Sequence, residues 1–280
     1  MTNKTVSIII RTFNEEKWIG TCIDKIKNQT FEGNIELFVV DSGSIDKTIE
    51  IARKKGAKII KLDKKNFSYG RSLNKGIEKA NGKYLVFISA HCIPKDDRWL
   101  DSLVSSYEKN IAAVYGPQFP HPEAPAYHRR RAKLFLGNKK IIEKDENTHY
   151  SNSNGSVRKD IWNKERFDEK LFFSEDKKWA LNVLKKGFFI VYEPKASVYH
   201  YHNFNVMSWF RRNYNQGKNS GKNTSTGYYF FTRLFSMVRN TIQDYQYSCG
   251  FKEKGVLFFQ SPLFNFIGFL GKVLGRIKGQ

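Results

Sequence analysis

The 280-residue chain is long enough for one large domain, or for one domain with an appendage, and its 40% hydrophobic and 15% aromatic residues exclude general disorder. Its charge is unbalanced, because 48 lysines and arginines stand against 27 acidic residues and leave a net charge of +21. Such a surface favours anionic partners, which include nucleic acid, acidic lipid head groups and phosphorylated substrates, and the charge alone does not choose among them.

The three cysteines, Cys22, Cys92 and Cys249, are far apart, and no two of them form a CxxC pair. This spacing argues against a disulfide framework and against a structural zinc site, and it favours a reducing compartment. The N-terminus runs almost at once into an apolar strand pattern, without the charged segment and apolar core of a secretory signal. We therefore expect a cytoplasmic protein.

Apolar, β-branched runs alternate with helical patterns through the first 115 residues. Short strands are predicted at 6–10, 35–40, 57–62, 84–88 and 112–115. Helices are predicted between them, from Trp18 to Ile26, after Asp46, from Ser72 to Ala80 and at about 97–110, where the periodicity is weakest. This alternation indicates a mostly parallel α/β sheet.

The pattern changes after Gly116. Four prolines crowd residues 117–125 and a basic run follows at 128–131, which predicts a loop and then a mobile or helical segment to about residue 146. Regular structure returns with a strand at 156–157, a helix from Glu175 to Gly187 and a strand at 188–192. A last extended stretch covers residues 198–202.

The tail from residue 203 onward has 11 basic and 2 acidic residues and is rich in phenylalanine and tyrosine. Between Lys254 and Lys272 it carries no charge, and apolar side chains crowd together. A membrane-spanning helix needs about 20 apolar residues, whereas this segment is shorter and contains Pro262. It fits better in the membrane interface, between flanking lysines and arginines. The alternative is a helix that packs on the main domain or on a second subunit.

Small and polar residues follow two of the predicted strands, at the edge where an open parallel sheet binds ligands. Ser89 and His91 come after the fourth strand, on the same side of an extended chain. Asp41-Ser42-Gly43-Ser44 follows the second strand, where a carboxylate can accept hydrogen bonds from a ribose or a base edge. Both stretches also fit an ordinary loop. Neither GxGxxG nor GxxxxGKS/T occurs, which argues against a Rossmann dinucleotide site and a P-loop.

Three further groups suit chemistry on a phosphorylated substrate. Arg71 near a helix N-terminus would repel the helix dipole, and a bound diphosphate would remove that conflict, although a solvated loop arginine is the alternative. Glu175 and Asp176 fit a helix start, where one carboxylate over the site could instead deprotonate a sugar hydroxyl. His200 and His202 share one side of an extended chain and could reach a divalent cation.

Taken together in chain order, these residues resemble the inverting glycosyltransferases of family two, which have the GT-A fold. The resemblance covers about residues 4–205 and rests on five segments: Arg11-Thr12-Phe13-Asn14-Glu15-Glu16, Asp41-Ser42-Gly43-Ser44-Ile45-Asp46, Phe67 to Lys75, Ser174-Glu175-Asp176, and Val198 to Asn203. Three shorter stretches are similar to the rhamnosyltransferase-like branch of surface polysaccharide assembly: Phe67-Ser68-Tyr69-Gly70-Arg71, Ser89-Ala90-His91-Cys92 and Val114-Tyr115-Gly116.

The resemblance implies a reaction and a set of site residues. A sugar passes from a nucleoside-diphosphate sugar to a hydroxyl of a glycan or lipid-linked acceptor, with inversion, and Asp176 takes the acceptor proton. Glu175 and Trp179 are expected to contact the acceptor. The residues expected to bind the donor are Arg11, Thr12, Asn14, Glu15, Asp41, Ser42, Gly43, Gly70, Arg71, Asn74, Ser89 and Ala90.

The chain departs from the family at the metal site, because the family's Asp-x-Asp falls on Ser89-Ala90-His91. Serine is a poor direct ligand, so a Mn²⁺ or Mg²⁺ ion is expected through His91 with His200 or His202. The alternative is that no metal ion binds, and that Arg71 and other cations neutralise the diphosphate. Two other functions stay open, a non-catalytic sugar-nucleotide binder and a basic nucleic-acid-binding protein, although the latter has no HTH, RRM, KH or zinc-finger signature.

The expected organisation is a GT-A catalytic domain at 1–205, followed by a helical extension at 206–280 that is basic and aromatic. The domain is expected to have a nucleotide-binding half to about residue 118 and an acceptor half at about 119–205. The extension would hold the enzyme at the inner face of the membrane as a peripheral protein, near its acceptor. An oligomer is compatible with the sequence, and nucleic acid is not an expected partner.

Overall fold

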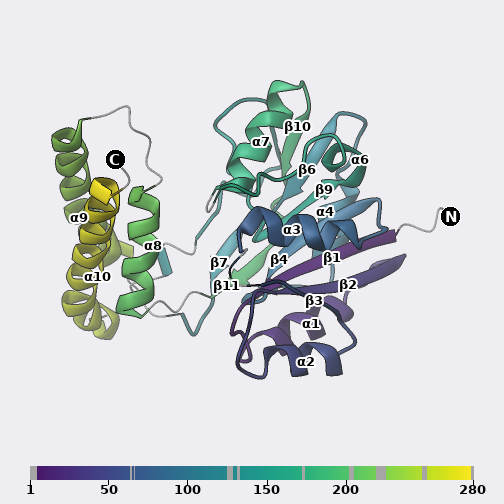
Figure 1. Cartoon of the computed structure of the whole chain (residues 1–280), viewed down its shortest axis with the longest axis horizontal. Coiled ribbons are helices and arrows are strands. Elements are labelled where there is room, and N and C mark those ends of the chain that lie inside the picture. Colours follow the sequence, from purple (N-terminus) through teal and green to yellow (C-terminus); the bar gives the residue numbers. More distant parts are fainter. Residues whose placement is uncertain are drawn as a thin grey trace. The chain divides into compact units, whose positions relative to one another are not determined.

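The computed structural model describes residues 5–63, 65, 67–124, 129–130, 133–171, 174–201, 205–218, 225–247 and 251–278. These residues form two compact units (Figure 1). The first unit comprises Met1–Phe119 and Leu134–His200, and the second comprises Pro120–Lys133 and Tyr201–Gln280.

The first unit is built on an eight-stranded sheet. Its strand order is β3 (Lys58–Lys61), β2 (Asn34–Asp41), β1 (Thr5–Thr12), β4 (Tyr84–Ser89), β9 (Asn154–Arg158), β6 (Ile111–Tyr115), β10 (Phe189–Tyr192) and β8 (Ile141–Glu143). The strands β3, β2, β1 and β4 pair in parallel, and so do β6 and β10. Strand β9 is antiparallel to both of its neighbours, β4 and β6. The predicted α/β fold with a mostly parallel sheet is confirmed.

Helices cover the sheet and leave its central strands buried. They are α1 (Ile19–Lys27), α2 (Thr48–Lys54), α3 (Tyr69–Glu78), α4 (Trp99–Ser105), α6 (Lys159–Trp162) and α7 (Glu175–Lys185). Helix α3 packs on β1 and β2, α4 packs on β6 and β9, and α7 packs on β10. Every residue of β4 is buried, which explains why its sequence is a continuous apolar run rather than an alternating one.

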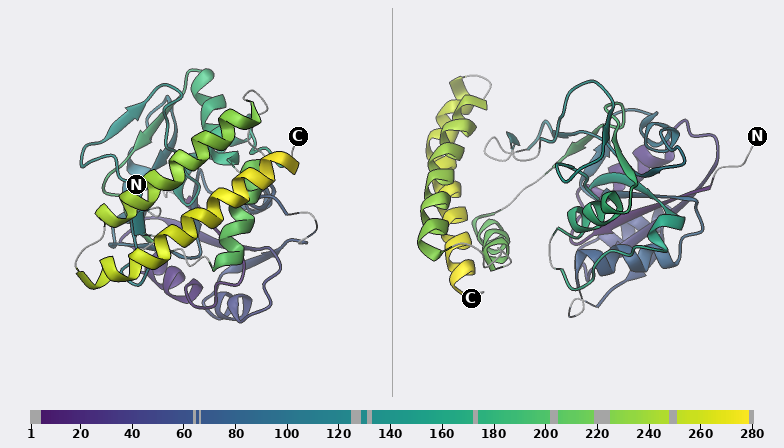
Figure 2. Two further views of the ribbon diagram at one scale, coloured as in Figure 1. Left: turned by 90° about the vertical axis from the view of Figure 1, so that its left-hand side faces the viewer. Right: turned by 90° about the horizontal axis from the view of Figure 1, so that it is seen from above.

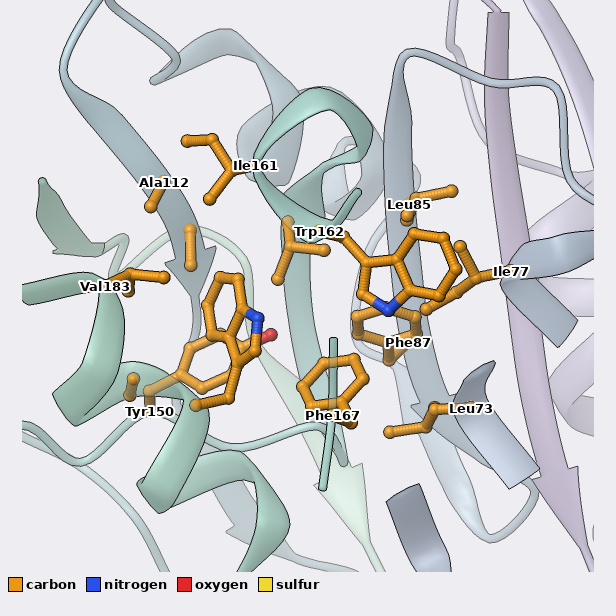
Figure 3. Packing of buried hydrophobic residues seen from close by; sticks show 14 of the residues in the cluster. Leu73, Ile77, Leu85, Phe87, Ala112, Tyr150, Ile161, Trp162, Phe167 and Val183 are labelled. Carbon is orange, nitrogen blue, oxygen red and sulfur yellow. The ribbon is translucent and has the colours of Figure 1, made fainter. Parts of the chain in front are cut away.

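Aromatic side chains fill the core between the sheet and helices α3 and α7 (Figure 3). The ring of Phe87 on β4 meets that of Phe167 edge to face, with centroids 5.6 Å apart. Phe167 in turn lies 5.5 Å from the ring of Trp179 on α7. Fully buried aromatic residues contribute a large share of hydrophobic stability, so this cluster fixes the start of α7 against the sheet.

Several strands lie where the sequence predicted none. Strands β7 (Gln118–Pro120) and β8 fall within the segment predicted as a loop and a helical stretch, and β7 joins β11 (Val198–His200) and β5 (Cys92–Pro94) in a second, three-stranded sheet. The predicted helix at 97–110 was too long, since α4 ends at Ser105. Just beyond that end, the ring of Tyr107 stacks on Tyr84 at 4.5 Å.

The second unit contains the helices α8 (Val206–Lys218), α9 (Thr226–Tyr247) and α10 (Phe251–Lys278), and α10 contacts both others (Figure 2). Glycines allow α8 and α10 to approach closely. A Cβ atom on Gly217 would lie 2.1 Å from the carbonyl oxygen of Lys272, and one on Gly275 would lie 1.9 Å from that of Tyr214.

Helix α10 is longer than the sequence indicated, because it continues through Pro262 and past Lys272. Its segment Val256–Lys278 has 23 residues and is, by length and composition alone, long and apolar enough to cross a membrane. The uncharged stretch between Lys254 and Lys272 is thus part of a helix that is long enough to span, although that stretch alone is shorter.

Candidate active site

The polar residues predicted to form a site meet at the carboxyl edge of the parallel strands. In the sheet register Thr12 is paired with Asp41, and Arg11 is paired with Ser89. Helices α3 and α7 begin at the same edge, since the Arg11 guanidinium lies 5.0 Å above the ring of Tyr69 and bonds to Glu175. We call the residues that meet here the strand-end cluster: Arg11, Thr12, Asp41, Ser89, His91, Glu175 and Asp176.

The centre of the strand-end cluster is an ion pair between Arg11 and Glu175. Arg11 Nη1 donates to Glu175 Oε1 at 3.2 Å, and the two side chains are only 14% and 5% exposed. Asn152 Nδ2 lies 3.5 Å from the same carboxylate oxygen. Burial raises the pKa of Glu175, the neighbouring charge of Asp176 raises it further, and the Arg11 guanidinium opposes both.

Asp176 lies in the first turn of α7 and is only partly buried. Its Oδ1 accepts a hydrogen bond from the Lys177 backbone N–H at 2.8 Å, and its Oδ2 lies 3.4 Å from the backbone nitrogen of Asn152. The residue before the acidic pair, Ser174, has the left-handed backbone angles φ 65° and ψ 27°. Such strain at a residue other than glycine costs about 1–3 kcal/mol, and it is found most often at functional sites.

Asp41 is almost fully buried and shapes the loop that follows β2. Its Oδ2 accepts from the backbone N–H groups of Gly43 and Ser44 at 3.0 Å each, and its Oδ1 accepts from Ser44 Oγ at 2.5 Å. A carboxylate has about four acceptor positions, so one remains for a ribose hydroxyl or a base. Gly43 sits at φ 96°, a backbone angle that favours glycine. Ser42 donates from its backbone N–H to the Thr12 carbonyl at 3.1 Å.

Hydrogen bonds tie this loop to the one that follows β1. Asn14 donates from its backbone N–H to Ser44 Oγ at 2.8 Å, and its side-chain Oδ1 accepts from the Ile45 backbone N–H at 2.9 Å. Asn14 adopts a positive φ of 53°, which asparagine tolerates better than most residues. Glu15 donates from its backbone N–H to Thr48 Oγ1 at 2.7 Å. The two predicted donor loops therefore form one hydrogen-bonded assembly.

The predicted metal ligands His91 and His200 lie side by side. His91 Nδ1 is 2.6 Å from Glu15 Oε1, and His200 Nδ1 is 2.6 Å from Gln118 Oε1. Their rings are stacked, with centroids 5.1 Å apart and planes within 13°. Because ring-nitrogen lone pairs lie in the plane of the ring, two stacked rings do not direct them at one ion. His202 lies outside the described residues.

Within the described part of the chain, no group of three His, Cys, Asp or Glu side chains could hold a metal ion. The protein residues seen here therefore do not fit a self-sufficient metal centre. Glu15 and His91 form an oxygen and nitrogen pair that could supply two ligands, with others coming from a bound diphosphate.

The remaining predicted residues differ in how they are placed. Arg71 is partly exposed and bonds through Nε to Glu169 Oε2 at 2.9 Å. Gly70 lies against the backbone of Asp168, where a Cβ atom would come within 2.4 Å of the carbonyl oxygen. Ala90 donates from its backbone N–H to the Arg11 carbonyl at 3.2 Å.

Two predicted contact residues lie in the core instead of at this edge. Asn74 is 1% exposed, and its amide binds Trp162, the Phe167 carbonyl and Glu169. Trp179 is also 1% exposed, and its Nε1 donates to the Glu165 carbonyl at 2.6 Å. Both side chains are thus engaged with protein partners, and these contacts help to position α3 and α7.

Sequence reasoning missed three residues that touch the site. Asn152 lies beside both Glu175 and Asp176, Tyr69 lies beneath Arg11, and Glu169 holds Arg71. The polar run 151–153 before β9 was a usable signal for Asn152, since such runs mark loops that bear function. The sequence contains no comparable signal for Glu169.

Comparisons with known proteins agree with this geometry. The family described as Glycosyl transferase family 2 matches residues 7–172. The O-antigen chain rhamnosyltransferase RfbN of Salmonella typhimurium is 30% identical over 224 residues, which cover 76% of this chain and 71% of that protein. The O-antigen chain rhamnosyltransferase WbaN of Salmonella anatum is 28% identical over 224 residues, with 75% and 70% covered.

A solved structure with a similar fold is the mannosyltransferase PcManGT from Pyrobaculum calidifontis in complex with GDP-Man and Mn²⁺. It has a TM-score of 0.56 and 13% identity, and the match covers 95% of this chain and 73% of that one. The predicted GT-A fold is confirmed by this likeness, and the predicted glycosyltransferase family is confirmed by the family match. The chain belongs to glycosyl transferase family 2.

Proposed function

We propose that the strand-end cluster catalyses the inverting transfer of a sugar from a nucleoside-diphosphate sugar to an acceptor hydroxyl during assembly of a surface polysaccharide. The observation that carries this proposal is the Arg11–Glu175 ion pair. It holds the start of α7, and with it Asp176, at the edge of the sheet where the donor loops begin. The O-antigen relatives support the polysaccharide, and a rhamnose conjugate is the first donor to test.

Asp176 is the proposed general base. Its carboxylate is partly exposed, and the contacts with Asn152 and the Lys177 N–H fix its orientation. As the acceptor oxygen attacks the anomeric carbon, Asp176 takes the hydroxyl proton and the bond from that carbon to the diphosphate breaks. Glu175 is buried beside it and bonded to Arg11, so we assign it the positioning of Asp176 and Arg11 rather than proton transfer.

The donor is proposed to lie over the ends of β1 and β2. Asp41 has one acceptor position for the nucleoside, and Thr12 Oγ1 is buried with no hydrogen-bond partner among the described residues, so a ligand atom could satisfy it. Arg71 is proposed to meet the diphosphate at the N-terminus of α3, where helix amides also favour negative charge. Its bond to Glu169 is partly exposed and therefore weak, and it uses only Nε.

A divalent cation is proposed to bind together with the donor. Glu15 and His91 would hold it, with oxygen atoms of the diphosphate completing its coordination, and it would neutralise charge on the leaving group. The likeness to a structure that contains Mn²⁺ supports this proposal. Arg71 is the alternative source of positive charge.

The second unit is proposed to attach the enzyme to the inner surface of the cell membrane. Helix α9 exposes a continuous apolar stripe at helical spacing, which includes Phe231, Phe235, Val238, Ile242 and Tyr245, and Phe235 is 80% exposed. The unit has 15 basic and 3 acidic residues in its sequence. Exposed apolar stripes with excess positive charge favour anionic bilayers. A contact with a second copy of the chain is the alternative, and gel filtration would detect it.

The proposed reaction is tested by thermal unfolding with sugar conjugates of UDP, GDP, dTDP and CMP, each with and without Mn²⁺. The true donor should raise the unfolding midpoint, because a ligand that binds only the folded state stabilises it. Release of free nucleoside diphosphate on addition of acceptor then measures transfer. Donor binding without any hydrolysis or transfer would instead favour a non-catalytic sugar-nucleotide binder.

A further inference from the structure

A cavity of about 270 Å³ lies among the three helices of the second unit. Its lining comes from α8, α9 and α10, together with the segment that contains Arg130. Four of the lining residues are basic, namely Arg130, Arg212, Arg233 and Lys272, and none is acidic. The other lining residues include amide and hydroxyl side chains, among them Asn213, Gln216 and Ser236. We call this cavity the basic pocket.

Arg130 and Arg233 make different contacts with the protein around the basic pocket. Each guanidinium nitrogen of Arg130 makes one hydrogen bond, Nε to Asp244 at 2.8 Å, Nη1 to Gln243 at 3.1 Å and Nη2 to Asn240 at 3.1 Å. Arg233 lies with its guanidinium 4.8 Å above the ring of Tyr229. Its Nε is buried without a hydrogen-bond partner within the described chain.

The basic pocket lies on the opposite side of α9 from the exposed apolar stripe. Its lining residues on this helix are Arg233, Ser236, Met237 and Asn240, whereas the stripe contains Phe231, Phe235, Val238 and Ile242. At 100° per residue, the two sets point in roughly opposite directions. The pocket is thus separate from the surface that we propose to contact the membrane.

We propose that the basic pocket binds a phosphate or diphosphate group. Guanidinium groups bind phosphate oxygens in a two-pronged geometry, and amide and hydroxyl donors around them can complete the coordination. An anion would place negative charge in a cavity that four basic and no acidic side chains line. This inference does not depend on the proposed sugar transfer, because no residue of the strand-end cluster lines the pocket. The phosphate could belong to a soluble molecule or to a lipid head group.

The test is isothermal titration of the full chain with inorganic pyrophosphate at constant ionic strength. The wild type should bind at two sites, the basic pocket and the donor site, and Arg212→Gln with Arg233→Gln should remove one of them or weaken it at least tenfold. The control is Arg211→Gln with Arg239→Gln, which removes the same charge from exposed positions on the same two helices. This control should leave the affinity of both sites for pyrophosphate within about twofold of the wild type. Equal losses of pyrophosphate binding in the two double variants, or no loss in either, would overturn the proposal.

A second arm distinguishes the two sources of phosphate. Vesicles of phosphatidylcholine with phosphatidic acid are compared with vesicles that carry oleate at the same surface charge. If the pocket variant loses the preference for phosphatidic acid and the control variant keeps it, the result supports the site and assigns it to a lipid. Pocket-dependent binding of pyrophosphate without that loss supports the site and assigns it to a soluble ligand.

Hydrogen exchange on the wild-type protein is a third test, and it does not depend on whether the variants fold. Pyrophosphate should slow exchange in α8 and α9, and slowing confined to the first unit would show that the basic pocket is empty. Donor binding should be unchanged in the pocket variant, so failure of this inference and failure of the proposed sugar transfer give different results.

Discussion

Arg11 Nη1 and Glu175 Oε1 are 3.2 Å apart although the two residues are separated by 164 positions in the sequence. The contact joins the end of β1 to the first residue of α7. It thus joins the donor loops to the proposed catalytic carboxylate through one buried ion pair. Truncating one partner of such a pair is more costly than losing an exposed one, because the other charge stays buried.

Asp176→Asn removes the proposed base while keeping the shape of the side chain. Sugar transfer should fall by about 10²–10⁴-fold, which is the usual contribution of a positioned base, while donor affinity stays within about twofold. Steady-state turnover and donor titration measure the two effects. The matched control is Asp160→Asn, which changes an exposed aspartate on α6 that pairs with Arg158. This variant should keep full activity. Wild-type turnover in Asp176→Asn would remove its assigned role.

Arg11→Gln should destabilise the first unit by about 1–3 kcal/mol, because it leaves the Glu175 carboxylate buried without its cation. Glu175→Gln, Arg11→Gln and the double variant complete a mutant cycle that urea unfolding can measure. We expect a coupling energy of about 0.5–3 kcal/mol, as for residues in direct contact. Purely additive effects would show that the ion pair contributes nothing to holding α7 at the sheet.

The pH dependence of stability should reveal Glu175. Its pKa is raised in the folded protein, so between its unfolded and folded pKa values the folded state binds more protons than the unfolded state. Wild-type stability should therefore fall as pH rises through that window, starting near the ordinary value of 4.5. The stability of Glu175→Gln relative to the wild type should rise over the same window, as measured by denaturant unfolding at a series of pH values.

Glu50→Gln is the control of opposite sign for this pH series. The exposed Glu50 bonds to Lys54, and this partner lowers its pKa. Its contribution to stability should therefore be present above its unfolded pKa and be lost as pH falls. If stability relative to the wild type changed with pH in the same direction in both variants, the assignment to Glu175 would be contradicted.

Gly217→Ala and Gly227→Ala form a contrasting pair in the second unit. A Cβ atom at Gly217 would meet the Lys272 carbonyl oxygen at 2.1 Å, so α8 and α10 must separate, at a cost of about 1–3 kcal/mol. A Cβ atom at Gly227 meets nothing within 4 Å, so alanine there should gain up to about 1 kcal/mol from helix propensity. Hydrogen exchange of α8 and α10 measures the effect of Gly217→Ala, and that of α9 measures the effect of Gly227→Ala. Slower exchange of α8 and α10 in Gly217→Ala would contradict the packing.

The sequence alone was enough to predict the parallel strands at the start of the chain and the loops at their ends. Apart from the buried Ser7, the run Val6 to Ile10 and the run Tyr84 to Ile88 are continuously apolar, because both faces of these strands are buried. Turn and cap chemistry in Asp41-Ser42-Gly43-Ser44 is local, so its position at a strand end is readable from neighbouring residues. The family resemblance rested on those same local segments.

Tertiary structure decided the contacts that join distant segments. The antiparallel strand β9 enters the sheet between β4 and β6, and this placement brings Asn152 to Glu175. The stacking of His91 on His200 and the burial of Trp179 depend on how β11 and α7 pack, which no local pattern of residues encodes. Propensity and periodicity act over a few residues, whereas the strand-end cluster is assembled by packing between segments up to 164 residues apart.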